Sequence, residues 1–200
     1  MQPSPHASHT FIAAFSEIVQ RIASTLDNVP KRILPINMYV AGGAALHFYT
    51  GERVTRDIDA SFSRRIALPA DLEISYRDED GPHLLYFDRQ YNDTLGLLHE
   101  DAYDDSQSLS LPEVDAGIID VRLLTPLDLA ISKIGIFASQ DRDDIATLAR
   151  LHLINEKGLR TRATEAAIAY VGDVARLEGS INLACRLVAD VARKEKSLKK

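Results

Sequence analysis

Cysteine and long apolar runs are scarce in this 200-residue chain. Because Cys185 is the single cysteine, the chain cannot form an internal disulfide framework or a zinc site built on thiolates, and a reducing compartment fits. No stretch approaches the ~18 consecutive apolar residues of a membrane span, and the N-terminus lacks a basic region followed by an apolar run. We therefore expect a soluble, cytoplasmic protein with no membrane partner.

Closely spaced histidines and excess positive charge are also absent. The six histidines show no spacing that would place two ligands on one helix face, so we expect no zinc site. The 23 Lys and Arg residues face 29 Asp and Glu residues, which gives a formal net charge of -6. A nucleic acid substrate would therefore have to be met by a local basic patch or by a metal ion.

The chain does have enough apolar residues for a sizeable core. Hydrophobic residues make up 46% and charged residues 26%, which are ordinary values for a globular protein. A chain of this length accommodates one domain, or one domain with a helical extension. We predict an α+β fold, in which residues 1–124 form an α/β core with a small mixed sheet and residues 125–200 form a helical region packed on it.

Two adjacent glycines follow a short apolar stretch at residues 38–41, which reads as a buried strand. Gly42 and Gly43 would allow the backbone to approach a phosphate closely. Residues 44–49 can then begin a helix, and a helix N-terminus favours anions. The pattern predicts a strand, a turn and a helix that together cradle a phosphate.

Alternating polar and apolar residues at 57–62 predict a second strand that carries two carboxylates. Asp57, Asp59 and Ser61 would share one face of it. Neighbouring carboxylates repel each other unless a cation lies between them, and Mg²⁺ bound by oxygen ligands is the common solution. The pattern predicts a Mg²⁺ site at Asp57 and Asp59, where two ions ~4 Å apart could serve an in-line displacement.

Such a site calls for a third carboxylate, and the sequence offers two. Asp120 would lie with Arg122 on the polar face of a strand at residues 117–124. Glu73 lies on an equally alternating strand at residues 72–76. Asp120 is the preferred candidate, and the sequence leaves both open.

Periodicity and end signals place the remaining elements. Apolar residues at helical spacing predict a helix over residues 11–26, and a Thr125-Pro126 start with Asp128 as capping partner predicts a helix that runs through Lys133. The acidic run at residues 100–105 is expected to be a solvated turn. Further strands are expected at residues 84–87, 94–99 and 106–111. A further helix is expected to begin near Asp141 and to stop at Gly158. Two more helices are expected over residues 163–174 and 181–191, the second after a cap at Ser180.

Five motifs follow one another along the chain: Gly42-Gly43, Asp57-x-Asp59, Asp120, Lys133 and the Arg142-Asp143-Asp144 cluster. Their order, over about residues 39–151, resembles the polymerase-β-like nucleotidyltransferases. It resembles more closely the small bacterial toxin and abortive-infection-type members of that superfamily. In place of the serine that usually follows the first glycine, this chain has Gly43.

The resemblance implies roles for the first four of these motifs. Gly42 and Gly43 would contact the triphosphate of an NTP. Asp57, Asp59 and Asp120 would bind Mg²⁺, and Lys133 would reach the triphosphate or the acceptor. As cations near the phosphates, Arg53 and Arg56 are further nucleotide-binding candidates, and so is Ser61 on the face of the acids.

The implied activity is transfer of a nucleoside monophosphate from an NTP to a hydroxyl of RNA, particularly a tRNA end, or of a protein. A toxin-like role would add a cognate antitoxin as partner. Two other functions stay open. A catalytically degenerate module would bind nucleotide or a partner without turnover, and the departure at Gly43 favours it. Metal-dependent phosphodiester hydrolysis also uses paired acids, but it leaves the glycine turn unexplained.

Overall fold

The computed structural model describes residues 6–52, 54–91 and 96–198. The fold is α+β, as predicted, with two small sheets and flanking helices. The chain divides into two compact units. The first comprises Met1–Tyr91 and Ser106–Leu124, and the second comprises Asn92–Asp105 and Thr125–Lys200. The division into domains at residues 1–124 and 125–200 stays a prediction.

The first sheet of unit 1 has the order β3-β1-β7-β6. Its central strand β1 (Ile36–Val40) pairs antiparallel with β3 (Ala60–Phe62) and parallel with β7 (Ile119–Leu123), and β6 (Gln107–Ser108) adds a short edge. Residues alternate between buried and half-buried along β1 and β7, because only one face of this sheet contributes to the core. The buried face comprises Ile36, Met38, Val40, Ala60, Ile119, Val121 and Leu123.

The second sheet has the order β2-β5-β4. Strands β4 (Glu73–Asp78) and β5 (Gly81–Phe87) form an antiparallel hairpin, and β2 (Asp57–Ile58) pairs parallel with β5. The prediction of one strand over residues 57–62 was therefore wrong in one respect. The segment is interrupted at Asp59, and its two halves join different sheets.

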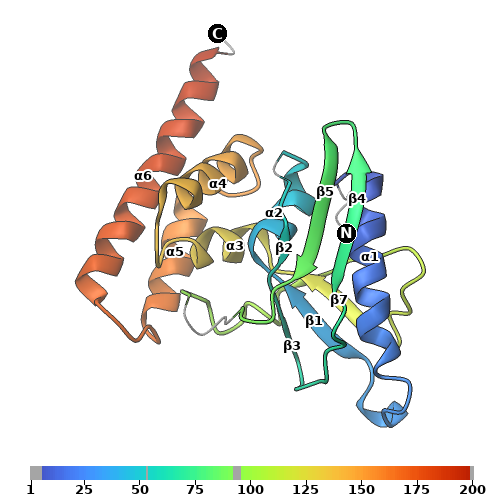
Figure 1. Ribbon diagram of the computed structural model, residues 1–200. Helices are drawn as coiled ribbons and strands as arrows, with labels where there is room; N and C mark the ends of the chain where they lie inside the picture. Colours follow the sequence, from blue (N-terminus) through green and yellow to red (C-terminus); the bar gives the residue numbers. More distant parts are fainter. Residues whose placement is uncertain (1–5, 53, 92–95, 199–200) are drawn as a thin grey trace. The chain divides into compact units, whose positions relative to one another are not determined.

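Two helices cover the core of unit 1. Helix α1 (His9–Ser24) begins at Ser8, whose hydroxyl accepts the Phe11 N–H at 3.2 Å, and lies along β4 and β5 (Figure 1). The ring of Phe15, in α1, packs edge-on against the ring of Phe48 in α2 (Gly42–Thr50), with ring centroids 5.0 Å apart. The predicted helix over residues 11–26 is confirmed, and its apolar stripe is buried.

Unit 2 consists mainly of four helices, α3 (Pro126–Ser132), α4 (Ser139–Arg150), α5 (Glu156–Ala167) and α6 (Val174–Leu198). The long α6 packs against α4 and α5 (Figure 1). The predicted start of α3 is confirmed, since the Thr125 hydroxyl accepts the Asp128 N–H at 3.1 Å. Among the helices that the structure describes, none combines the length and apolar character needed to cross a bilayer.

Several predicted boundaries in unit 2 were wrong. Helix α3 ends at Ser132, before Lys133. Gly158 lies in the first turn of α5, where the Asn155 side chain caps its N–H at 2.9 Å, so it begins a helix rather than ending one. Ser180 lies inside α6, because Leu177 and Ile181 continue one buried stripe through it.

Two predicted strands also differ from the structure. Residues 94–95 of the strand expected at 94–99 lie outside the described residues, and residues 96–99 form no strand. The strand expected at residues 106–111 is reduced to β6. The acidic run at residues 100–105 is a turn, as predicted.

A buried carboxylate organises unit 2. Asp128, the predicted capping partner at the start of α3, is only 1% exposed. It accepts hydrogen bonds from Arg162 Nε at 3.0 Å and Nη2 at 3.1 Å and from the Thr125 hydroxyl at 2.7 Å. Arg162 also reaches Asp105 at 2.7 Å, which ties the turn at residues 100–105 to α5. Burial alone would lower the pKa of Arg162, but the hydrogen bonds and charges of Asp128 and Asp105 outweigh it and raise this pKa.

We expect Arg162→Met to lower the free energy of unfolding by ~3–5 kcal/mol, because it leaves Asp128 buried without its cation. Arg160→Met, on the same helix, is the matched control. The ion pair of Arg160 with Glu156 is exposed, with side chains 45% and 47% accessible, so its loss should cost less than ~1 kcal/mol. Urea unfolding of both variants measures the difference, and equal losses would contradict this account.

Candidate active site

The end of β1 and the start of α2 form a tight turn against Asp59. Gly42 has φ +56°, a backbone conformation that residues other than glycine rarely adopt. A Cβ built at Gly42 would lie 2.8 Å from Cγ of Asp59 and would overlap its Oδ2. The structure therefore brings the glycine turn and the Asp59 carboxylate together, and only glycine fits at position 42.

Backbone pairing holds this approach in place. The Ala41 N–H donates to the Asp59 carbonyl at 2.8 Å, which extends the β1–β3 ladder by one pair. Helix α2 starts at the next residue, Gly42, and Gly43 in its first turn is buried. The Asp59 carboxylate thus lies at the N-terminal end of α2, where the helix dipole favours negative charge.

The two acids of the Asp-x-Asp motif alternate with buried residues. Asp57 and Asp59 are half-buried, whereas Ile58 and Ala60 are buried, which matches the predicted division of faces. The Asp57 carboxylate accepts a hydrogen bond of 2.5 Å from the hydroxyl of Thr55. Asp59 stands at the point where the chain leaves the second sheet and enters the first.

Sequence reasoning missed a further acid, Asp88. Parallel pairing places Asp57 opposite Tyr86 and Ile58 opposite Phe87, and the Asp88 N–H continues the ladder by donating to the Ile58 carbonyl at 3.1 Å. Asp88 therefore lies opposite Asp59 on the neighbouring strand, ~4.8 Å away at the backbone and on the same face. Its carboxylate accepts the Gln90 N–H at 2.8 Å.

The only sequence signal for Asp88 was its place directly after an apolar strand. Parallel pairing of β2 with β5 could not be read from the sequence, because the chain passes through β3 and β4 between them. An antiparallel partner would have placed a different residue beside Asp59. The pairing direction therefore decided which acid the structure brings close.

The structure does not bring Asp120 beside the acid pair. Asp120 is half-buried on the polar face of the first sheet, where it accepts hydrogen bonds from Ser108 at 2.6 Å and from Arg122 at 2.9 Å. It pairs with Asn37, four residues before Ala41, so it lies ~13 Å further along the strands than Asp59. Its role as third acid stays a prediction.

Glu73, the rival, lies in the same cross-strand row as Asp57. Tyr86 stands between them, in register with both. Two strand spacings separate the two acids at the backbone, ~10 Å, and the Glu73 side chain is exposed. This candidate also stays a prediction.

The nucleotide-binding candidates have different surroundings. Arg53 lies outside the described residues. Arg56 is exposed directly before β2, and its carbonyl accepts the Tyr86 N–H at 2.8 Å. Ser61 is half-buried in β3 opposite Tyr39. These assignments to phosphate or nucleotide stay predictions.

Lys133 belongs to unit 2, where it follows the last turn of α3. Its Nζ lies 2.6 Å from Oδ2 of Asp144 and 3.8 Å from Oδ1 of Asp141. Asp144 is 4% exposed, so it serves as the buried partner of Lys133. Asp141 caps α4 by accepting the Ala138 N–H at 2.8 Å.

A family model described as "Nucleotidyltransferase of unknown function (DUF6036)" matches residues 17–178. The chain belongs to this family. The match includes Gly42, the three acids Asp57, Asp59 and Asp88, and Lys133. No curated protein and no solved structure matches the chain. The predicted nucleotidyltransferase family is thus confirmed, and membership of the toxin and abortive-infection group stays a prediction.

The acids of this DUF6036 protein supply oxygen ligands, which suit Mg²⁺. Asp57 and Asp59 share a face, and the close approach of Gly42 holds the Asp59 carboxylate in place. Within residues 6–52, 54–91 and 96–198, no three His, Cys, Asp or Glu side chains are already close enough to hold a metal ion. The carboxylate oxygens of Asp57 and Asp59 are donors of the kind that a hard cation prefers, and these two acids would hold it.

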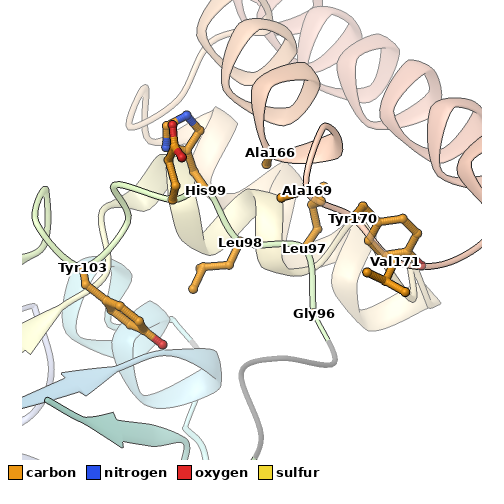
Figure 2. A pocket seen from close by; sticks show the side chains of 10 residues that line it. Gly96, Leu97, Leu98, His99, Tyr103, Ala166, Ala169, Tyr170 and Val171 are labelled. Atoms are coloured by element: carbon orange, nitrogen blue, oxygen red, sulfur yellow. The ribbon is translucent and has the colours of Figure 1, made fainter. Parts of the chain in front are cut away.

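This DUF6036 protein also has a cavity of about 400 Å³ within unit 2 (Figure 2). His99 lies in its wall, with Nδ1 accepting the Asp101 N–H at 3.1 Å and Nε2 lying 3.4 Å from Oε2 of Glu165. Tyr103 and Tyr170 stand at opposite ends of the lining in Figure 2. None of the predicted site residues lines this cavity.

We expect Gly42→Ala to lower the free energy of unfolding by at least ~1 kcal/mol, because it forces a side chain into a left-handed backbone and against Asp59. It should also abolish nucleotide binding. Gly179→Ala is the control, since Gly179 lies inside α6 with nothing within 4 Å of a new Cβ. That change should stabilise the protein by up to ~1 kcal/mol. Urea unfolding and nucleotide titration measure both, and a neutral Gly42→Ala would contradict the close approach.

Proposed function

We propose that this protein transfers a nucleoside monophosphate from an NTP to a hydroxyl group and releases pyrophosphate. The observation that carries the proposal is the Asp59 carboxylate set against Gly42 at the start of α2, in a chain of a nucleotidyltransferase family. Such a transfer needs a backbone that can approach phosphates, close to carboxylates that can bind a metal ion. The acceptor oxygen forms a bond to the α-phosphorus, the bond from that phosphorus to the α,β-bridging oxygen breaks, and the hydroxyl proton is released.

The glycines and arginines are proposed to hold the triphosphate. Backbone N–H groups at Gly42 and Gly43 would approach its oxygens, and Arg53 and Arg56 would offset its charge. Ser61, on the face of the acids, would offer a hydroxyl to the nucleotide. The chain as a whole is acidic, so these local groups must provide the attraction.

Asp57 and Asp59 would hold Mg²⁺. When bound, this ion neutralises charge on the phosphates and polarises the phosphoryl group. The low exposure of Ile58 and Ala60 on the opposite face supports a fixed orientation of both carboxylates. The protein's own contribution is positioning, which accounts for much of the catalysis in phosphoryl transfer.

For the third acid we propose Asp88 in preference to Asp120 and Glu73. Its register beside Asp59 supports this choice, and Gln90 donates only one hydrogen bond to it. Asp120 already has Arg122 and Ser108 as partners. Each of the three is separately testable.

Lys133 is proposed to reach the triphosphate or the acceptor. Its ion pair with buried Asp144 supports a positioned ammonium group, since the two atoms are 2.6 Å apart. The acceptor is proposed to be RNA, particularly a tRNA end, or a protein hydroxyl. A toxin role in the cytoplasm, with a cognate antitoxin, rests on the resemblance of motifs alone.

Incubation with Mg²⁺, each α-labelled NTP and total cellular RNA or protein should place label in a polymer. Asp57→Asn and Asp59→Asn should each lower the transfer rate at least ~100-fold, because loss of a metal ligand removes several kcal/mol of transition-state stabilisation. Asp143→Asn, at an exposed position of α4, is the control and should leave the rate unchanged. EDTA should stop transfer, and added Mg²⁺ should restore it.

Nucleotide binding without transfer, unchanged by Asp57→Asn and Asp59→Asn, would instead support the degenerate module. Gly43 in place of serine and the absence of three assembled acids among the described residues favour that alternative. Release of free nucleotide from a polymer, without NTP, would support hydrolysis.

The third acid is identified by comparing Asp88→Asn, Asp120→Asn and Glu73→Gln in the same assay. We expect Asp88→Asn to lower the rate at least ~100-fold, as the acid pair does, and the Mg²⁺ concentration for half-maximal rate to rise. The other two should keep most of the rate. A large loss in Asp120→Asn with normal transfer in Asp88→Asn would restore Asp120 to the role predicted from sequence.

A further inference from the structure

The polar face of the first sheet continues away from the acid pair. Along β3 the side chains of Asp59 and Ser61 share this face, and Ser61 is in register with Tyr39 on β1. The next row pairs Ser63 with Asn37, through a backbone hydrogen bond of 2.9 Å and a bond of 3.0 Å from the Asn37 N–H to the Ser63 hydroxyl. A row of small polar groups beside a tyrosine therefore leads from the acids toward the far end of β3.

Four cations gather at that far end. Lys31 and Arg32 lie in a short 3-10 helix before β1, and Arg64 and Arg65 follow β3 after one intervening residue, Ser63. Since β1 and β3 are antiparallel, the start of one strand lies beside the end of the other, which brings both pairs to the same end of the sheet. We call these four residues the basic patch.

The basic patch contrasts with the charge of the whole chain. All four side chains are exposed, and none forms an ion pair within the part of the chain that the structure describes. Residues 29–40 and 60–70 contain these four cations and no acid, in a chain of net charge -6. Of the nearby acids, Asp27 is exposed and Asp71 is paired with Arg21 at 2.7 Å. Asp120, which is in register with Asn37 on the same face of the sheet, is paired with Arg122 at 2.9 Å.

The spacing suits a polymer. From the row of Asp59 to the row of Ser63 is four residues of strand, ~13 Å, which matches about four stacked nucleotides at ~3.4 Å each. Tyr39 stands between the acids and the basic patch, half-buried, with its hydroxyl accepting from Asn37 at 3.1 Å. Cations that follow a phosphate backbone, beside an aromatic ring on which a base can stack, are the usual elements of single-strand binding.

We infer that the basic patch binds the phosphate backbone of a single-stranded polynucleotide whose terminal hydroxyl is the acceptor. This rests on the proposed function, and it selects a polynucleotide over a protein as acceptor. Lys31, Arg32, Arg64 and Arg65 would neutralise phosphates, and Tyr39 would stack a base nearer the acids. The patch is exposed and lies wholly in unit 1.

The test is fluorescence anisotropy of the full chain with labelled 12-nucleotide single-stranded RNA, the matched DNA and the matched duplex, over a series of salt concentrations. Four phosphate contacts predict that log of the binding constant falls with log of salt with a slope of ~-2.8. We test two double variants, Lys31→Gln/Arg32→Gln and Arg64→Gln/Arg65→Gln. Each should reduce the magnitude of the slope by ~1.4, because it removes two phosphate contacts. At 0.1 M salt, this change corresponds to ~25-fold weaker binding than in the parent protein. Thermal unfolding should stay unchanged in both.

Arg176→Gln/Arg186→Gln is the matched control, because both arginines are exposed on α6 and the change in net charge is the same. It should leave affinity and slope unchanged. Equal losses in the control and the patch variants would reduce the effect to overall charge and overturn the inference, and so would tighter binding to the duplex. RNA and DNA binding alike would support the patch, and transfer to only one of them would identify the acceptor.

Failure of this inference is distinguishable from failure of the proposed function. Transfer that depends on Asp57 and Asp59, in a protein whose patch variants bind RNA like the parent, would overturn the inference alone. RNA binding that depends on the patch, in a protein that transfers no nucleotide, would overturn the proposed function alone. Labelling of protein but not of polynucleotide would also overturn the inference.

Discussion

The contact between Gly42 and Asp59 is the constraint on which the candidate site depends. A Cβ at Gly42 would overlap the Asp59 carboxylate, and the φ of +56° would strain any other residue there. The Ala41 N–H donates to the Asp59 carbonyl at 2.8 Å, next to the β1–β3 ladder. This pairing contributes to holding Asp59 against the start of α2.

The interruption at Asp59 explains why one short segment serves two sheets. Before it, Asp57 belongs to a strand that runs parallel to β5, which brings Asp88 alongside. After it, Ser61 belongs to a strand that runs antiparallel to β1, which leads along a polar face to the basic patch. Catalytic and acceptor-binding roles can therefore sit on the same stretch of chain without sharing side chains.

Charge is distributed differently in the two units. In unit 1, the acids and the basic patch are half-buried or exposed, where a ligand can reach them. In unit 2, Asp128 and Asp144 are buried and each is neutralised by a cation, Arg162 and Lys133 respectively. Buried pairs of this kind fix the arrangement of the elements that carry them, because breaking one leaves an unpaired charge in a low-dielectric interior.

The sequence by itself determined the elements that depend on local rules. Periodic apolar residues specified α1, the Thr125 cap specified the start of α3, and alternation specified the two faces around Asp57 and Asp59. These signals work because hydrogen bonding and burial repeat at fixed spacing within one element. The order of the motifs along the chain also sufficed to predict the nucleotidyltransferase family.

Only the tertiary structure decided which distant residues meet. Strand order and direction placed Asp88 beside Asp59 and left Asp120 with Arg122, although the sequence pattern around Asp120 looked more favourable. Helix ends such as Gly158 were likewise decided by a neighbouring cap. Long-range pairing has no local signature, since it depends on which buried faces pack against each other once the whole chain has collapsed.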